Sequence, residues 1–128
     1  MISKNLYLRT IFLILGLIIV NFLVSFLIVK AGFPVTQNYF PAGFGYSIFT
    51  SILIFALGVF CIYKLNLLKQ FPLITTLIVA GAVSNFLEYI IFGFVVDYIN
   101  IGIAVLNLAD LLIYGGLVLL NWKILTKK

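Results

Sequence analysis

The sequence predicts an all-α membrane protein: a four-transmembrane-helix bundle with both termini cytoplasmic and a short extracytoplasmic loop region after the first helix. Three observations carry this prediction. Hydrophobic residues make up 65% of the chain and charged residues 9%, against about 45–50% and 25% in soluble domains. The apolar residues gather in runs close to the length that crosses a bilayer. Nearly all basic residues lie between these runs. We therefore expect the 128 residues to form a single transmembrane domain.

Four apolar segments define the expected helices. Residues 10–29 are an uncharged run of mostly Ile, Leu, Phe and Val, and about 20 such residues span a bilayer at 1.5 Å per residue. Residues 30–47 contain two prolines and three glycines, which indicates a loop. The second helix is expected over residues 48–63. The third covers residues 72–93 and begins with a proline, which suits a first helical turn. The fourth covers residues 105–125.

The basic residues predict the orientation of these helices. Cytoplasmic loops of membrane proteins carry an excess of Lys and Arg. Of the eight basic residues, only Lys30 lies on the side of the first and third connections. The other seven share the opposite side, which places both termini in the cytoplasm: Lys4, Arg9, Lys64, Lys69, Lys123, Lys127 and Lys128.

The residue types that are absent restrict the chemistry. The chain has no histidine and one cysteine, Cys61, so Ser-His and Cys-His nucleophiles and His-ligated zinc are excluded. We interpret Cys61, which lies in an apolar run, as a small core hydrophobe. Hydrolysis would need carboxylates or a Ser-Lys pair, and every lysine flanks a helix. The net charge of +5 does not indicate nucleic acid, because the basic residues mark the ends of apolar runs.

All three acidic residues lie between positions 81 and 120: Glu88, Asp97 and Asp110. An ionisable side chain at the centre of a membrane helix costs about 2.5–3.5 kcal/mol on insertion scales, so such residues indicate a functional site. Asn85 shares a helical face with Glu88, and Asn107 shares a face with Asp110 at the start of the last helix. With the expected topology, Asp97 and Asp110 both lie near the outer surface of the membrane.

Asp97 and Asp110 are the candidate catalytic pair. Two carboxyl groups about 3 Å apart cannot both ionise, so one activates water while its protonated partner polarises a carbonyl. Asn85 and Asn107 are suited to orient the pair or the scissile carbonyl, and with Glu88 they are the candidate substrate-binding residues. Simpler interpretations stay open at this point. Asp97 would be solvated if its loop is exposed, and Glu88 would pair with a lysine or be neutralised by its surroundings.

Three stretches carry a recognisable pattern. Residues 81–89 read GAVSNFLEY, residues 95–98 read VVDY, and residues 106–115 read LNLADLLIYG. They resemble two motifs of the lipoprotein signal peptidase (signal peptidase II) family, G-x-x-x-N-x-x-D-R followed by V-V-D-F, and F-N-x-A-D-x-x-I-x-x-G. In this resemblance Asp97 and Asp110 fall on the two aspartates of the family's catalytic dyad. The expected four-helix topology also agrees with the family.

Other positions depart from the family pattern. The family's Asp-Arg pair is replaced by Glu88 and Tyr89. Its first motif, D-x-x-S/T-K, falls on residues 21–25, which read NFLVS and lack both the Asp and the Lys. Its N-x-G-x-A-F-G/S motif survives only faintly over residues 38–45. Two interpretations follow: a divergent enzyme with altered substrate positioning, or a paralogue that binds without cutting.

The resemblance implies an intramembrane aspartyl endopeptidase of the bacterial inner (cytoplasmic) membrane. Its substrate would be a prolipoprotein whose cysteine carries a diacylglyceryl group, cut just before that cysteine, and the lipid would enter laterally between the helices. Asp97 and Asp110 would activate the water without a metal or organic cofactor. A globomycin-type inhibitor would occupy the same groove. We expect a monomer in contact with membrane lipid.

Two other classes of function compete with the enzyme. A non-catalytic paralogue would hold a lipidated peptide in the same groove, and the lost arginine and first-motif residues favour it. A small channel or transporter subunit would use Asp110 or Glu88 for ion or proton passage. The channel gives no reason for the V-V-D and N-x-A-D patterns, so the peptidase is the hypothesis that accounts for most of the sequence.

Overall fold

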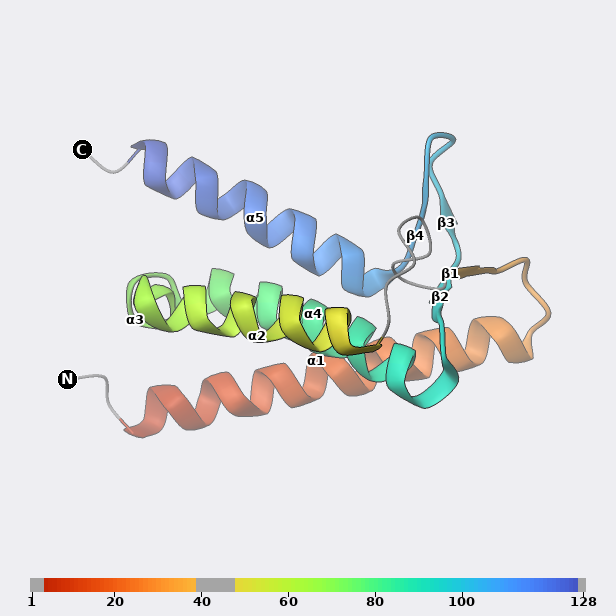
Figure 1. The fold of residues 1–128 in the computed structure, drawn as a ribbon, viewed down its shortest axis with the longest axis horizontal. Coiled ribbons are helices and arrows are strands. Elements are labelled where there is room, and N and C mark those ends of the chain that lie inside the picture. Colours follow the sequence, from red (N-terminus) through yellow and green to blue (C-terminus); the bar gives the residue numbers. More distant parts are fainter. Residues whose placement is uncertain (1–3, 39–47, 127–128) are drawn as a thin grey trace.

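The structure is a computed structural model and describes residues 4–38 and 48–126. Most of these residues are helical (Figure 1). The elements run in the order α1 (Lys4–Lys30), β1 (Thr36–Asn38), α2 (Ile48–Lys64), α3 (Leu67–Gln70), α4 (Pro72–Phe92), β2 (Val95–Asp97), β3 (Ile99–Asn100), β4 (Val105–Leu106) and α5 (Leu108–Thr126). Residues 39–47 of the predicted first loop lie outside the described part of the chain.

Three of the described helices are long and apolar enough to cross a membrane: α1 over residues Leu8–Lys30, α4 and α5. Helix α2 is shorter, with 17 residues. Helix α1 begins at Lys4, six residues before the predicted start, because the segment that carries Lys4 and Arg9 continues the helix. This mostly helical architecture agrees with the predicted multi-pass membrane protein.

Helix α4 is the centre of the bundle and packs against both α1 and α5. The contact with α5 depends on glycine. A Cβ atom at Gly81 would meet the carbonyl oxygen of Ala109, and it would lie 2.8 Å from Cγ1 of Ile113. One at Gly116 would lie 2.5 Å from Cγ1 of Ile78. Small residues let membrane helices approach closely, so α4 and α5 are held at a short distance.

The distribution of side chains is inverted relative to a soluble protein. The largest fully buried side chains are polar, with Glu88, Asn21 and Asn107 each 0% exposed. Leucine, isoleucine and phenylalanine residues lie on the outside of α1, α2 and α5. This is expected where lipid is the solvent, because apolar residues gain little by avoiding it. The prediction that Cys61 is a core residue is therefore wrong: its side chain is exposed on α2.

Short strands gather at one end of the bundle, while α3, the start of α1 and the end of α5 lie at the other (Figure 1). Strand β1 pairs antiparallel with β2, so that Thr36 lies opposite Asp97 and Asn38 opposite Val95. Strands β3 and β4 form an antiparallel hairpin. Residues 105 and 106, predicted as the start of the last helix, belong to this hairpin. Their pairing with β3 and the cap formed by Asn107 delay helix α5 until Leu108.

Candidate active site

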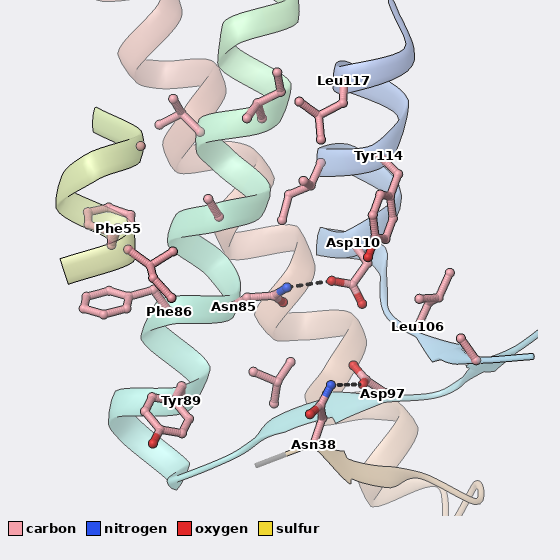
Figure 2. Close-up of a pocket in the computed structure, with 18 of the residues that line it drawn as sticks. Asn38, Phe55, Asn85, Phe86, Tyr89, Asp97, Leu106, Asp110, Tyr114 and Leu117 are labelled. Atoms are coloured by element: carbon pink, nitrogen blue, oxygen red, sulfur yellow. Dashed lines mark hydrogen bonds between the residues drawn. The ribbon is translucent and has the colours of Figure 1, made fainter. Parts of the chain in front are cut away.

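A cavity of about 770 Å³ lies between α2, α4 and α5 and is closed at one end by β1, β2 and β4. Most of its wall is apolar, including Ile54, Ile78 and Leu117. Phe55 of α2 stacks on Phe86 of α4, with ring centroids 4.8 Å apart, and both rings line the cavity. Polar groups converge near the strands, where Figure 2 shows them pointing into one space: Asn38, Asn85, Asp97 and Asp110.

Asp110 is held by the first turn of α5. Its Oδ2 accepts the backbone N–H of Asn107 at 3.1 Å, and Oδ1 of Asn107 accepts the backbone N–H of Asp110 at 2.8 Å. This reciprocal arrangement is a capping box, in which the residue before the helix and the third helical residue satisfy each other's N–H groups. The negative charge also lies at the N-terminal end of the helix dipole, where it is favoured.

Asp97 is held by strand β2 and is 2% exposed. Its Oδ2 accepts Nδ2 of Asn38 at 3.0 Å, and its Oδ1 accepts Nδ2 of Asn107 at 2.9 Å. The carboxyl group thus has neutral amide donors on both oxygens. In the described residues no lysine or arginine forms an ion pair with it.

Asn85 and Asn107 connect the two aspartates. Nδ2 of Asn85 donates to Oδ1 of Asp110 at 2.8 Å, and Nδ2 of Asn107 donates to Oδ1 of Asn85 at 3.0 Å. The same Nδ2 of Asn107 also donates to Asp97. The fully buried amide of Asn107 therefore bonds directly to Asp97 and, through Asn85, is connected to Asp110. We call Asn38, Asn85, Asp97, Asn107 and Asp110 the aspartate network.

Burial raises the pKa of Asp97 above its usual value, and the nearby carboxyl groups of Asp110 and Glu88 raise it further. The hydrogen bonds from Asn38 and Asn107 favour the ionised form and oppose this rise in the pKa. A carboxyl group in this position keeps its proton to a higher pH than an exposed aspartate. Asp97 is therefore suited to the protonated role in a pair of carboxyl groups.

Glu88 does not line the cavity. Its side chain is 0% exposed and faces α1 and β2. Oε1 accepts Nδ2 of Asn21 at 3.0 Å and Oγ of Ser25 at 2.8 Å, and Oε2 accepts the backbone N–H of Val96 at 3.0 Å. The carboxyl group has no contact with the cavity, so a direct substrate contact by Glu88 does not fit this geometry.

The comparison with protein families decides the relationship of this chain. The family profile described as signal peptidase (SPase) II matches residues 1–126. The chain belongs to the signal peptidase II family. The resemblance seen in the VVDY and LNLADLLIYG stretches is thereby confirmed.

Curated relatives and solved structures agree with this family. The chain is 51% identical over 51 residues to a lipoprotein signal peptidase of Caldicellulosiruptor bescii, and 48% identical over 56 residues to one of Lactococcus lactis subsp. lactis. These matches cover 39% and 41% of this chain, but only 34% and 37% of the relatives. The chain thus spans about a third of the length of the curated relatives it matches.

Two solved bacterial membrane enzymes have the same fold. One has a TM-score of 0.76 at 17% identity and is matched over 94% of each chain. The other has a TM-score of 0.73 at 19% identity, over 91% of this chain and 87% of that chain. At these identities the likeness concerns the fold alone.

The structure reveals the contacts of two sets of residues that the sequence analysis did not assign to the site. Asn38 reaches Asp97 because β1 pairs with β2, a contact between residues 59 positions apart. The only signal for it was the faint motif over residues 38–45. Asn21 and Ser25 stand where the family has an Asp and a Lys, and both contact Glu88. Their spacing of four on an apolar helix was the available signal.

The described residues offer no obvious metal site. No group of three or more Cys, Asp and Glu side chains comes together in residues 4–38 and 48–126 in a way that would hold an ion. The aspartate network contains two carboxyl groups and three amides, and its donors are all amide or backbone N–H groups.

Proposed function

We propose that this protein is an intramembrane aspartyl endopeptidase that removes signal peptides from diacylglyceryl-modified prolipoproteins. One observation carries the proposal: Asp97 and Asp110 line the same apolar cavity and are bridged by Asn85 and Asn107. Membership of the signal peptidase II family and the names of the curated relatives point to the same substrate class.

Asp97 and Asp110 divide the chemistry between them. Asp110 takes a proton from water as the water oxygen attacks the scissile carbonyl carbon, and Asp97, whose pKa is raised by burial, gives its proton to the carbonyl oxygen. The tetrahedral diol then collapses and the C–N bond breaks. The leaving amine takes the proton held by Asp110, and Asp97 recovers its own from the diol. The apolar walls strengthen each of these interactions by excluding water.

Asn85 and Asn107 keep the two carboxyl groups in register, and Asn38 closes the site from the side of β1. These residues act through the aspartates, and Asn85 and Asn38 also face the cavity.

The rest of the cavity matches an apolar ligand. Ile54, Ile78 and other aliphatic side chains of α2, α4 and α5 form walls suited to a signal-peptide segment and to acyl chains. Lateral entry from the lipid between these helices brings the bond before the modified cysteine to the aspartates. A globomycin-type inhibitor would bind the same cavity.

The proposed topology has four spans, with α2 as the fourth, and both termini in the cytoplasm. The basic residues support it: Lys64 and Lys69 flank the turn into α3, and this turn lies at the same end of the bundle as the start of α1 and the end of α5 (Figure 1). The aspartate network then lies at the outer face of the bacterial inner membrane, with the protein acting as a monomer in contact with lipid.

The deciding experiment is cleavage of a diacylglyceryl-modified prolipoprotein by purified protein in detergent. Wild-type protein is expected to release the signal peptide, globomycin is expected to block this, and Asp97→Asn and Asp110→Asn are each expected to abolish it while still binding substrate. An active signal peptidase II of known sequence in a parallel reaction controls for the substrate. No cleavage by the wild type beside that active control would overturn the proposal.

The same experiment separates the alternatives. Binding of prolipoprotein or globomycin without cleavage would indicate the non-catalytic paralogue. Loss of both cleavage and binding would indicate the channel class, which is tested by ion flux in vesicles.

A further inference from the structure

A second polar cluster lies behind the aspartate network and takes no part in the proposed chemistry. It consists of Glu88, Asn21, Ser25 and the backbone N–H of Val96, and we call it the Glu88 cluster. A carboxyl group with 0% exposure in a membrane helix is costly unless its contacts satisfy it. The two oxygens of Glu88 accept hydrogen bonds from three donors, two side chains of α1 and one backbone N–H of β2.

One arm of the Glu88 cluster leads to Asp97. Oε2 of Glu88 accepts the backbone N–H of Val96 at 3.0 Å, and Val96 directly precedes Asp97. Consecutive Cα atoms are about 3.8 Å apart, so this bond fixes the backbone within one residue of the carboxyl group. The other edge of β2 is fixed by its pairing with β1. Strand β2 is thus held from α4 on one side and from β1 on the other.

A second arm leads to Asp110. Ser25, whose hydroxyl donates to Glu88, is close enough to the Tyr98 hydroxyl to oppose the rise that burial causes in the pKa of Tyr98. The Tyr98 oxygen accepts the backbone N–H of Leu108 at 3.1 Å. Leu108 is the first residue of α5 and lies two residues before Asp110. Ser25 and Tyr98 therefore connect Glu88 with the helix end that carries the second aspartate.

The three side chains of this cluster stand at positions that depart from the family pattern. Asn21 and Ser25 replace the Asp and Lys of the first motif, and Glu88 replaces the Asp of the third. Glutamate is one methylene longer than aspartate, and serine is much shorter than lysine. The two changes act in opposite directions on side-chain length. They also leave a single carboxyl group satisfied by neutral donors, so the changed positions form one unit.

We propose that Glu88 is a positioning residue that holds both aspartate-bearing segments in place, and that positions 21, 25 and 88 act together in this role. This inference rests on the proposed peptidase function. It explains why a carboxyl group is buried at position 88 although it does not line the cavity.

The first test is Glu88→Gln, with Ser84→Ala as the matched control. Glutamine keeps the size of the side chain, but it offers one acceptor oxygen in place of two to the three donors of the cluster. We expect kcat to fall by about 10- to 100-fold with KM within about twofold, because misplacement of reacting groups lowers turnover. Ser84 lies one turn earlier on the same face, is 0% exposed and has no hydrogen-bond partner among the described residues. Ser84→Ala is expected to leave both parameters unchanged. Equal kcat values for Glu88→Gln and wild type would overturn the inference.

A second measurement does not depend on activity. Amide hydrogen exchange of residues 94–98 is expected to speed up in Glu88→Gln and to stay at the wild-type rate in Ser84→Ala. This result separates the inference from the proposed function: an inactive wild type with the expected exchange pattern would overturn the peptidase and keep the positioning role. If Glu88→Gln does not fold, Tyr98→Phe replaces it and is expected to lower kcat and speed exchange at Leu108. Wild-type exchange at that amide would overturn the inference.

The coupling between positions is tested by a double-mutant cycle with Glu88→Asp and Ser25→Lys. Glu88→Asp draws the carboxyl group back by one methylene, and Ser25→Lys extends a donor toward it, so each change offsets the other in direction. We expect the double variant to be more active than the product of the two single effects predicts. Multiplicative effects would overturn the claim that these positions act as one unit.

Discussion

Two polar clusters in this membrane protein are built from the same parts but face different surroundings. The aspartate network opens into the cavity, whereas the Glu88 cluster is closed off between α1, α4 and β2. In both, carboxyl groups accept hydrogen bonds from amides, hydroxyl groups or backbone N–H groups, and within the described residues neither contains an ion pair.

The difference teaches what makes a buried carboxyl group available for chemistry. Asp97 and Asp110 line the cavity, although each of their oxygens also accepts a hydrogen bond. Glu88 likewise accepts hydrogen bonds on both oxygens, but it does not line the cavity. Polarity, burial and hydrogen bonding alone therefore do not identify a candidate reactive group in a membrane protein. Its position on the wall of a cavity does.

The sharpest way to test this comparison is to neutralise the carboxyl groups that face the cavity. Asp97→Asn and Asp110→Asn are each expected to lower kcat by about 10⁴-fold, the scale seen when one member of a catalytic pair is removed. Asparagine keeps the size of each side chain but can accept only one of the two hydrogen bonds that each aspartate accepts, so detergent thermal melts should show a loss of about 1–3 kcal/mol beside the loss of turnover. Retained turnover in either variant would remove the distinction between the two clusters.

Asn107→Ala would attack the link between the two halves of the aspartate network. The change removes the cap of α5, worth about 1 kcal/mol, and leaves oxygens of Asp97 and Asn85 without a donor, at a cost of about 1–3 kcal/mol. We expect lower thermal stability and a fall in kcat of about 100-fold. Asn121→Ala is the control on the same helix, because Asn121 is exposed and bonds only to Leu117 of its own turn. A similar loss in both variants would contradict this role of Asn107.

Neighbouring glycines in α5 test the packing that brings Asn85 and Asp110 together. Gly116→Ala would place a Cβ atom 2.5 Å from Cγ1 of Ile78 in α4, so we expect overpacking to destabilise the protein by about 1–3 kcal/mol. Gly115→Ala has nothing within 4 Å and is expected to be neutral or to stabilise by about 0.5–1 kcal/mol through helix propensity. Thermal melts in one detergent would compare them. The reverse order of stability would contradict the close approach of α4 and α5.

The smallest expected effect comes from Asn38→Ala. This change removes a hydrogen bond that favours the ionised form of Asp97, so the pKa of Asp97 should rise further. Asp97 works in its protonated form, so activity is lost as the pH rises through this pKa. The basic limb of the kcat/KM profile should therefore move to higher pH in the variant. A shift to lower pH would contradict the assignment of Asp97 as the protonated partner.

The sequence predicted much of this structure, and the misses have physical reasons. Runs of apolar residues located the long helices, and Asn85, Asn107, Asp97 and Asp110 were grouped correctly because helical spacing and proximity of two helix ends are local properties. Their catalytic role stays a prediction. The start of α5 was placed too early because Val105 and Leu106 are as compatible with an apolar helix as with a strand. Asn107, a favourable cap residue, was the signal for the correct start.

The contacts of Asn38 and Glu88 could not be derived in this way. The Asn38 contact depends on the pairing of two three-residue strands, whose register no local pattern specifies. The partners of Glu88 lie 63 and 67 positions away on α1. Lysines were considered as its partners, but the structure uses an amide and a hydroxyl on an otherwise apolar helix.

In the proposed topology α2 spans the membrane, and its length then has a consequence for the bilayer. Its 17 residues extend about 25 Å at 1.5 Å per residue, less than the roughly 30 Å of a typical hydrocarbon core. A bilayer adapts to such hydrophobic mismatch by thinning locally. Because α2 forms one wall of the cavity, we expect the thinnest lipid beside its opening. Lipids with longer acyl chains should then slow the proposed peptidase by making this deformation costlier.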